Sequence, residues 1–302
     1  MRAIPLLTLL ALSLPAPTLA VDELDFSTVG IYGTAFEFCD FTCLKMFPRP
    51  EFYQRYAQWI RDADARGQFV MVGLYTYDRV TLKGTIEEYI AKTDELLAAL
   101  PLDLVDIVFL NEENITWNNG FAIQNALYDH VKQAHPELPV YQWFTPNNTP
   151  HAGMGADGWI IDAYGLGGQR FRTYLAKYVA TGLPVINCVT ASPMIGELQS
   201  AQDQVDICRE FNIPMFFFAV DDIEGNPVVW LESDDPRLAQ WRGWFMRVRE
   251  MAHSTDTSLL PLPSAQWSYG IPLEVAAAED GTLEYLDDFS GQKLIDDATI
   301  EG

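Results

Sequence analysis

The chain has 302 residues, of which 49% are hydrophobic and 20% charged, so it has the composition of a folded globular protein and not of a disordered one. Its 42 Asp and Glu residues outnumber 19 Lys and Arg residues, and a formal net charge of −23 argues against nucleic acids and anionic membrane surfaces as partners. The chain is long enough to bury a large core. We expect a monomer that has neither a nucleic-acid nor a membrane partner.

Residues 1–20 have the three regions of a secretory signal peptide: a positive charge at Arg2, an apolar stretch over residues 4–14 and a small-residue ending at Ala20. The apolar stretch is too short for a membrane span, and no later segment offers about 18 uncharged apolar residues. We therefore predict cleavage after Ala20 and a soluble protein that is secreted or periplasmic.

From residue 27 onward, short runs of β-branched and aromatic residues alternate with amphipathic segments of helical length. The pattern predicts strands over residues 27–36, 68–77, 105–111, 139–145, 158–165, 184–192 and 214–222. It predicts helices over residues 50–66, 84–100, 119–134, 168–181, 197–211 and 235–252. Continuous apolar strands with intervening helices are typical of a parallel sheet that helices cover.

This alternation predicts a (β/α)8 TIM-like barrel over residues 21–252. Seven strands are legible, so the eighth lies before residue 27, is hidden between residues 38 and 67, or is absent from an irregular or seven-stranded barrel. A doubly wound open sheet is the structural alternative, but no Gly-rich phosphate turn follows the first strand. Residues 253–302 predict a linker and a small β appendage built from WSYGIPLEVA and GTLEYLDD.

Four cysteines occur in a chain that we expect to be exported, so disulfides are possible. Cys39 and Cys43 are four residues apart in the segment FCDFTC, and we predict a disulfide between them. Cys188 and Cys208 are either bridged or two buried thiols. The four histidines are scattered, and no zinc-like spacing occurs, so we predict neither a metal nor another cofactor held by these residues.

Carboxylates collect where the predicted strands end, which is the edge at which the active sites of such barrels form. These residues and their polar or aromatic neighbours are Glu37, Asp78, Asn111 to Asn114 (NEEN), Trp143, Asp162, Tyr164, Asp221, Asp222 and Glu224. Lys and Arg are nearly missing from the same ends. The pattern therefore predicts carboxylate chemistry on an uncharged substrate.

The segment VDIVFLNEEN is an apolar strand that leads directly into Asn-Glu-Glu-Asn. It resembles the Asn-Glu strand end of the large clan of retaining glycosidases built on (β/α)8 barrels, which implies that Asn111 holds a sugar hydroxyl and Glu112 is the general acid/base. It also resembles, more loosely, the Asn-x-Glu of endo-acting N-acetylglucosaminidases that use the substrate's acetamido group. That alignment selects Asn111 and Glu113. The clan keeps its nucleophilic Glu three strands later, where this chain reads PVINCVTASP and has no carboxylate.

The second carboxyl group that glycoside hydrolysis requires must therefore come from another strand. The possibilities are Asp162, Asp221 and Asp222, and we prefer Asp222 because its strand lies across the predicted barrel from Glu112. A wide separation of the two carboxylates predicts inversion of the anomeric configuration. The residues expected to bind sugar are Asn111, Glu37, Tyr75, Trp143, Tyr164 and Asp221, the aromatic ones by stacking.

The sequence thus predicts an exported glycoside hydrolase that acts on a neutral poly- or oligosaccharide, with Glu112 or Glu113 as the proton donor. One alternative is a non-catalytic carbohydrate-binding barrel, because the expected nucleophile is missing. The other is a polysaccharide lyase or a metal-assisted hydrolase in which Glu112, Glu113 and Asp162 hold Mg²⁺ or Ca²⁺. No GxSxG motif supports a serine hydrolase.

Overall fold

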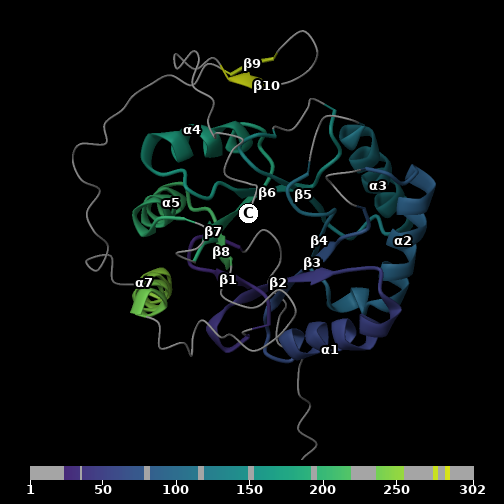
Figure 1. Cartoon of the computed structure of the whole chain (residues 1–302), viewed down its shortest axis with the longest axis horizontal. Coiled ribbons are helices and arrows are strands. Elements are labelled where there is room, and N and C mark those ends of the chain that lie inside the picture. Colours follow the sequence, from purple (N-terminus) through teal and green to yellow (C-terminus); the bar gives the residue numbers. More distant parts are fainter. Residues whose placement is uncertain are drawn as a thin grey trace, which may run out of the picture.

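The computed structural model describes residues 24–34, 36–77, 82–114, 119–148, 153–191, 196–218, 236–254, 275–277 and 283–285. Eight parallel strands within these residues close into a barrel (Figure 1). They are β1 (Val29–Tyr32), β2 (Phe41–Met46), β3 (Phe69–Leu74), β4 (Ile107–Phe109), β5 (Val140–Phe144), β6 (Gly158–Asp162), β7 (Val185–Thr190) and β8 (Met215–Phe218). Pairing of Val29 in β1 with Met215 in β8 closes the ring. The predicted (β/α)8 barrel is confirmed, and the doubly wound open sheet is wrong.

The eighth strand is β2, which was hidden between residues 38 and 67 in the sequence pattern. Its residues FTCLKM pair with β1 on one side and with β3 on the other. A short 3-10 helix, η2 (Phe36–Phe38), precedes it, so the segment FCDFTC is a turn followed by the start of a strand. The seven-stranded alternative is therefore wrong.

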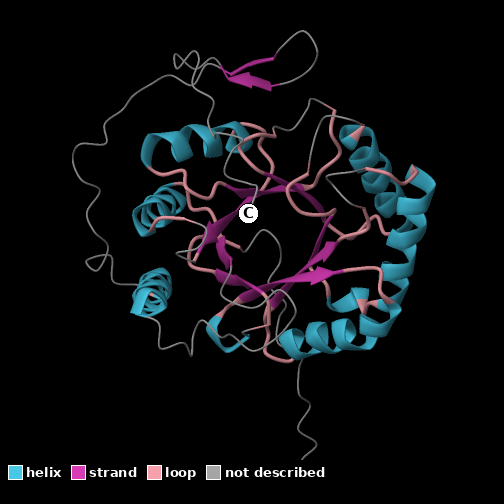
Figure 2. Ribbon diagram, viewed as in Figure 1, coloured by secondary structure: helices cyan, strands magenta, loops and turns pink. Residues whose placement is uncertain are grey.

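Six α-helices among the described residues form a ring outside the strands (Figure 2). They are α1 (Tyr53–Asp64), α2 (Ile86–Ala99), α3 (Gly120–Ala134), α4 (Gly168–Val179), α5 (Leu198–Glu210) and α7 (Pro236–His253). All six lie within the ranges predicted from the sequence or within one residue of them. At α2, Thr85 and Glu88 form a reciprocal capping box that fixes the first turn. None of the described helices has the length and apolar character that crossing a membrane requires.

3-10 helices η3 (Pro50–Phe52) and η4 (Leu102–Leu104) lie before α1 and β4, respectively. Near the C-terminus, β9 (Val275–Ala277) and β10 (Leu283–Tyr285) pair antiparallel, and both lie in the segments expected to form a small β appendage. The division of the chain at residues 252 and 253 stays a prediction.

Aromatic rings fill the interior of the barrel. Phe41, Phe69, Phe109, Tyr141, Trp143 and Phe216 belong to one buried cluster. Two glycines make room for these rings: a Cβ atom on Gly30 would lie 2.4 Å from the ring of Phe41, and one on Gly73 would lie 2.2 Å from the ring of Phe109. The interior is thus a packed core and not a channel, as is usual for this fold. A ligand site must lie above it, at the carboxyl ends of the strands.

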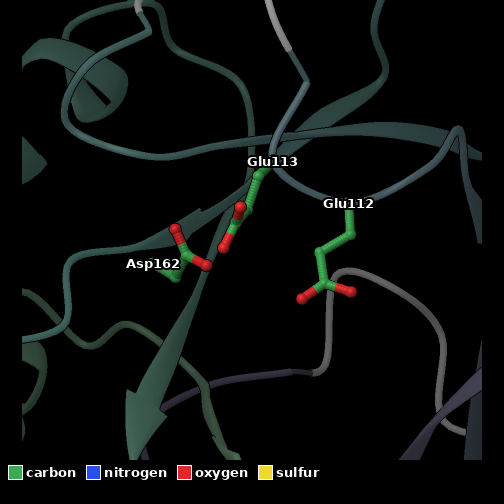
Figure 3. Close-up of side chains that lie close together, drawn as sticks. All are labelled: Glu112, Glu113 and Asp162. Atoms are coloured by element: carbon green, nitrogen blue, oxygen red, sulfur yellow. The ribbon is translucent and has the colours of Figure 1, made fainter. Parts of the chain in front are cut away.

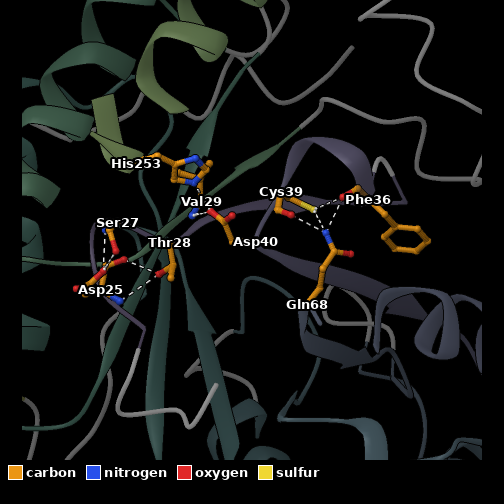
Figure 4. A network of polar contacts seen from close by, with 9 residues as sticks. All are labelled: Asp25, Ser27, Thr28, Val29, Phe36, Cys39, Asp40, Gln68 and His253. Atoms are coloured by element: carbon orange, nitrogen blue, oxygen red, sulfur yellow. Dashed lines mark hydrogen bonds and ion pairs between the residues drawn. The ribbon is translucent and has the colours of Figure 1, made fainter. Parts of the chain in front are cut away.

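The predicted disulfide between Cys39 and Cys43 is wrong, because no disulfide joins any of the four cysteines. Cys43 points into the interior of the barrel, whereas Cys39 packs in the cluster between the strands and the helices. The Sγ atom of Cys39 lies 3.4 Å from Nε2 of Gln68 (Figure 4). Cys188 and Cys208 are two buried thiols, and burial raises the pKa of Cys208 to about 12. These thiols remain protonated at physiological pH.

Three Asp–Val pairs join neighbouring strands at the amino-terminal face of the barrel. In each pair the Val N–H donates to the Asp Oδ2 atom, at 2.7 to 2.9 Å, and the Asp N–H donates to the Val carbonyl, at 2.8 to 3.0 Å. The pairs are Asp40 with Val29, Asp106 with Val70, and Asp157 with Val140. They fix the register of β1 with β2, of β3 with β4 and of β5 with β6.

The three aspartates differ in the charges around them. Nε2 of His253 in α7 lies 2.7 Å from Oδ2 of Asp40 (Figure 4), and Nζ of Lys132 in α3 lies 3.0 Å from Oδ2 of Asp157. Asp106 is partly buried and faces the negative charge of Asp64 instead. Burial is the main reason that the pKa of Asp106 is raised from 3.8 to about 6, although the Val70 N–H opposes the rise.

This raised pKa predicts how the Asp106→Asn variant responds to pH. Protonated Asp106 contributes its full stabilisation below pH 3.8, and this contribution is lost as the pH rises through about 6. We expect Asp106→Asn to raise the free energy of unfolding at pH 8 by about 1 to 2 kcal/mol, after allowance for solvent screening, and to change little at pH 4. Urea unfolding at the two pH values measures the difference.

Asp157→Asn is the matched control for this prediction. It removes the charge from a carboxylate that makes the same backbone hydrogen bonds but has Lys132 beside it, so we expect it to destabilise the protein at pH 8. An Asp106→Asn variant that is less stable than the wild type at pH 8 would contradict the prediction.

Candidate active site

A strained turn follows β4 and carries both glutamates. Asn111 has a φ of 65° and Glu113 a φ of 49°, in the left-handed region that residues other than glycine rarely adopt. The turn is held from both sides, because the Asn111 N–H donates to the Leu74 carbonyl of β3 at 3.2 Å and the Asn114 N–H donates to the Trp143 carbonyl of β5 at 2.7 Å. Backbone strain of this kind persists where the surroundings fix it, and it is common at active sites.

The two asparagines of NEEN brace this turn through their side chains. Asn111 is 2% exposed, and its Nδ2 donates to the Tyr77 carbonyl at 3.0 Å. Asn114 is fully buried; it accepts a hydrogen bond from the Tyr77 hydroxyl at 2.6 Å and donates to Gln142 at 2.7 Å. The predicted contact of Asn111 with a sugar hydroxyl stays a prediction, because the amide nitrogen of Asn111 donates to a backbone carbonyl in this structure. Tyr77 and Asn114 were not identified as positioning residues from the sequence.

Three carboxylates meet at the carboxyl ends of β4 and β6. Oxygen atoms of Glu112, Glu113 and Asp162 all lie within 4.8 Å of one another. Figure 3 shows the Glu113 side chain pointing toward Asp162, with the Glu112 carboxylate to one side. Asp162 is 1% exposed, whereas both glutamates are partly buried. Of the carboxylates predicted to pair with Glu112 or Glu113, the structure thus brings Asp162 to them.

Two phenols and one ammonium group surround Glu112. The Tyr32 hydroxyl lies 3.1 Å from its Oε2 atom, the Tyr75 hydroxyl donates to the same oxygen, and the two hydroxyls lie 2.7 Å apart. Lys45 Nζ is 3.7 Å from this oxygen and 4.3 Å from the centre of the Tyr75 ring. Burial, reinforced by the charge of Glu112, raises the pKa of Tyr32 well above its ordinary value, and burial likewise raises that of Tyr75. Both phenols therefore keep their protons.

Lys45 corrects the expectation that cations are nearly missing from the strand ends. It lies on β2, the strand that the sequence pattern did not reveal, so its place at the site could not be predicted. Tyr32, the last residue of β1, was missed as well, although the apolar run of β1 ends on it. An aromatic hydroxyl at a strand end was the available signal for Tyr32.

The predicted sugar-stacking aromatics differ in their exposure. Trp143 is fully buried in the barrel interior, with the ring of Phe109 5.1 Å and that of Phe216 5.4 Å away, centre to centre. A sugar can reach its indole only if these neighbours move. Tyr75 and Tyr164 are partly buried; the Tyr164 hydroxyl lies 3.0 Å from the Cys188 sulfur. A stacking role for these three residues stays a prediction.

Several predicted site residues lie outside the part of the chain that the structure describes. They are Asp78, Asp221, Asp222 and Glu224. Glu37 lies in η2, but its side chain is not among the described ones. The preferred pairing of Glu112 with Asp222 therefore stays a prediction.

The three carboxylates also have a spacing that can hold a divalent cation. Mg²⁺ and Ca²⁺ prefer oxygen ligands, which Glu112, Glu113 and Asp162 would each supply. Acidic groups commonly lie together without an ion, so this cluster alone does not assign a metal.

A scan against protein-family models finds no match for the sequence, and a search of curated proteins finds none either. Solved structures of similar fold include phosphoribosyl anthranilate isomerase from Thermococcus kodakaraensis, with 12% identity, a TM-score of 0.41, and 73% of this chain and 98% of that chain covered. An endo-β-N-acetylglucosaminidase from Cordyceps militaris has 10% identity, a TM-score of 0.45, and 73% and 90% of the two chains covered. A cellulase from an Icelandic hot spring isolate has 12% identity, a TM-score of 0.45, and 64% and 76% covered. An isomerase and glycosidases share this barrel, so the likeness concerns the fold alone.

Proposed function

We propose that the chain is an exported glycoside hydrolase that acts on a neutral poly- or oligosaccharide. The observation that carries the proposal is the meeting of Glu112, Glu113 and Asp162 within 4.8 Å at the carboxyl ends of the barrel strands. Glycoside hydrolysis needs two carboxyl groups that differ in protonation, and this edge of the barrel is where such groups act in enzymes of this fold.

Glu113 is the residue we assign as the proton donor. Its side chain faces Asp162, which is 1% exposed, and two carboxylates at such close range favour a shared proton over two negative charges. As the glycosidic bond breaks, Glu113 gives its proton to the leaving oxygen. Glu112, with two phenols and Lys45 beside it, is the carboxylate that we assign to bond to the anomeric carbon as the leaving oxygen departs. A water molecule that Glu113 deprotonates then displaces Glu112, which completes the hydrolysis and restores both side chains.

The close spacing supports retention of the anomeric configuration. Retaining enzymes hold their two carboxyl groups about 5 to 5.5 Å apart, and inverting enzymes hold them about 6.5 to 9.5 Å apart to admit a water molecule. One oxygen atom of each described carboxylate lies within 4.8 Å of the other two, which is nearer to the retaining spacing than to the inverting one. The mechanism proposed here thus differs from the across-barrel arrangement with Asp222, which the sequence favoured and which would give inversion.

The charge of the molecule supports a neutral substrate. The formal net charge is −23, and Lys45, which could otherwise neutralise a uronate, lies 3.7 Å from Glu112. An anionic polysaccharide would therefore meet uncompensated negative charge. The same argument disfavours a polysaccharide lyase.

The test is a screen of the purified protein against neutral glycans, with and without acetamido groups, followed by NMR of the first product within minutes of mixing. We expect the anomeric proton of the retained configuration to appear first and to equilibrate later. Turnover should be the same with and without a chelator, because the carboxylates do the chemistry.

Other outcomes of the same screen would replace the proposal. Inverted product would support the across-barrel pairing with Asp222. An unsaturated product would identify a lyase, and loss of turnover with the chelator, restored by Mg²⁺ or Ca²⁺, would identify a metal-assisted hydrolase. Glycan binding without turnover would support the non-catalytic barrel.

A further inference from the structure

We propose that Gln204, a buried residue of α5, is a positioning residue that fixes Tyr164 beside the three carboxylates. The inference rests on the proposed function and deepens it, because Tyr164 then helps to bind the glycan in one orientation. It assigns a task at the site to a helix that lies outside the barrel.

The loop that carries Tyr164, between β6 and α4, is rich in glycine. Residues 163–168 read AYGLGG, and Gly165 has a φ of 79°, in the left-handed region that glycine adopts without strain. Tyr164 is partly buried and Gly165 is exposed. A glycine-rich segment loses much conformational entropy when it is ordered. The position of Tyr164 therefore depends on contacts from outside the loop.

Gln204 provides these contacts with one amide group. It is fully buried in α5, a helix that packs against α4 and β7 (Figure 1). Its Nε2 atom donates to the Ala163 carbonyl and to the Leu166 carbonyl, at 2.7 Å in each case. These carbonyls lie on either side of Tyr164 and Gly165 in the sequence. The amide thus holds the loop on both sides of the phenol.

A second buried amide orients Gln204. Asn187 in β7 is fully buried, and its Nδ2 atom donates to Oε1 of Gln204 at 3.4 Å. A glutamine amide has two donor protons on nitrogen and an acceptor oxygen, so this contact turns Nε2 of Gln204 toward the loop. Both ends of the Gln204 amide are hydrogen-bonded, and a satisfied buried polar network specifies one arrangement.

Tyr164 lies where a ligand at the carboxylates would meet it. Its hydroxyl is 3.0 Å from Sγ of Cys188, which pairs with Asp162 in the register of β7 with β6. Its ring stacks on that of Phe218, at the end of β8, with the ring centres 5.8 Å apart. Burial is the main cause of the raised pKa of Tyr164, and the charges of Asp162 and Glu112 add to the rise. Both carboxylates therefore lie near this phenol.

Asp162 is held in a different way from Tyr164. It is the last residue of β6, and it pairs with Cys188 of β7. Sheet pairing therefore fixes the backbone of Asp162, whereas the Gln204 amide acts on the residues that follow it. Loss of the amide should weaken glycan binding by Tyr164 more than it slows the chemical step.

The experiment replaces Gln204 by methionine, which keeps the length of the side chain but has no amide. The matched control is Gln68→Met at the amino-terminal face of the barrel. Gln68 is also buried, and its Nε2 atom also donates to two loop carbonyls, those of Phe36 at 2.6 Å and Cys39 at 2.5 Å. Thermal melting confirms that each variant is folded.

The first readout is alkylation of the native protein, with each cysteine followed separately by peptide mass spectrometry. The Tyr164 hydroxyl lies against Cys188, so we expect Gln204→Met to increase the alkylation rate of Cys188 about tenfold, through local opening of the loop. The rate of Cys43, which is buried in the barrel interior, should stay within about twofold of the wild type. An unchanged rate for Cys188, or an equal increase for Cys43 and Cys188, would overturn the inference.

Gln68→Met should give the reciprocal result. The Sγ atom of Cys39 lies 3.4 Å from Nε2 of Gln68, so alkylation of Cys39 should become faster in this variant. The rate of Cys188 should not change. Faster alkylation of Cys188 in Gln68→Met would show that loss of any buried glutamine opens the site, and would overturn the inference.

Asn187→Leu keeps the inference testable if Gln204→Met does not fold. Oδ1 of Asn187 has no hydrogen-bond partner among the described residues, so we expect leucine, which has a similar size, to be tolerated. This variant leaves Gln204 in place without the amide that orients it. Alkylation of Cys188 should become about threefold faster, and an unchanged rate would overturn the inference.

The second readout is steady-state kinetics on a glycan. Gln204→Met should raise KM about fivefold and change kcat by less than about twofold, and Gln68→Met should change neither constant. In a Tyr164→Ala background, Gln204→Met should have no further effect on KM, because Gln204 acts through Tyr164. A further, additive rise in KM would show that it acts elsewhere and would overturn the inference.

The two proposals fail in different ways. If no glycan is hydrolysed, the alkylation rates still decide whether Gln204 fixes Tyr164, and only the proposed function falls. If glycans are hydrolysed while alkylation of Cys188 is the same in Gln204→Met and the wild type, only this inference falls.

Discussion

Replacing Glu113 by glutamine is expected to lower kcat/KM on an unactivated glycan by about 10²- to 10⁴-fold. The amide keeps the shape of the side chain beside Asp162 but cannot protonate the leaving oxygen. The loss should shrink to about tenfold or less on an aryl glycoside with a good leaving group, because such a group departs without a proton. Steady-state kinetics on the two substrates measures both effects.

The control for this substitution is Glu137→Gln, which removes an exposed carboxylate from the loop before β5 and should leave both rates unchanged. Glu112→Gln should reduce the two rates equally, because the Glu112 carboxylate is needed at the anomeric carbon whatever group leaves. An equal loss on both substrates in Glu113→Gln would show that Glu113 is not the proton donor.

Replacing Trp143 by alanine is expected to lower the free energy of unfolding by about 3 to 5 kcal/mol, which is the usual cost of deleting a large ring from a packed core. Trp143 is fully buried, and the rings of Tyr32, Phe109 and Phe216 pack around it. Trp143→Phe should cost less, about 1 to 2 kcal/mol, because Nε1 has no hydrogen-bond partner to lose.

Denaturant unfolding of the two variants separates a core role from a sugar-stacking role. If Trp143 forms the floor of the site, stability should fall in both variants while KM for the glycan in Trp143→Phe stays within about twofold of the wild type. A Trp143→Ala protein of wild-type stability whose KM rises strongly would instead assign the indole to the substrate.

Most of the architecture could be predicted because the spacing of apolar residues in the long regular segments indicates strands and helices directly. All seven legible strands and all six helices occur where the pattern placed them. The strand β2 was missed because FTCLKM mixes Thr and Lys with apolar residues and follows a short turn, so it has neither a continuous apolar run nor a helix before it. Its absence from the prediction also hid Lys45.

The candidate site was predictable in its members and not in their arrangement. Glu112, Glu113 and Asp162 stand at strand ends in the sequence, but the direction of each side chain depends on a turn with positive φ at Asn111 and Glu113. Such backbone angles in residues other than glycine are set by tertiary contacts, here those with Leu74 and Trp143. The buried position of Trp143 likewise follows from packing across the barrel.

The Asp–Val pairs have a consequence for how the ring is assembled. They tie β1 to β2, β3 to β4 and β5 to β6 across separations of 11, 36 and 17 residues, so three doublets can form from segments that are near in sequence. Loop closure costs more entropy when β8 meets β1. At that seam, Nε2 of His253 in α7 lies 2.7 Å from Oδ2 of Asp40, 213 residues away in sequence, so the same carboxylate contacts both the β1–β2 doublet and α7. Asp40 therefore joins β1 to β2 and also connects them to α7, which follows β8 in the chain.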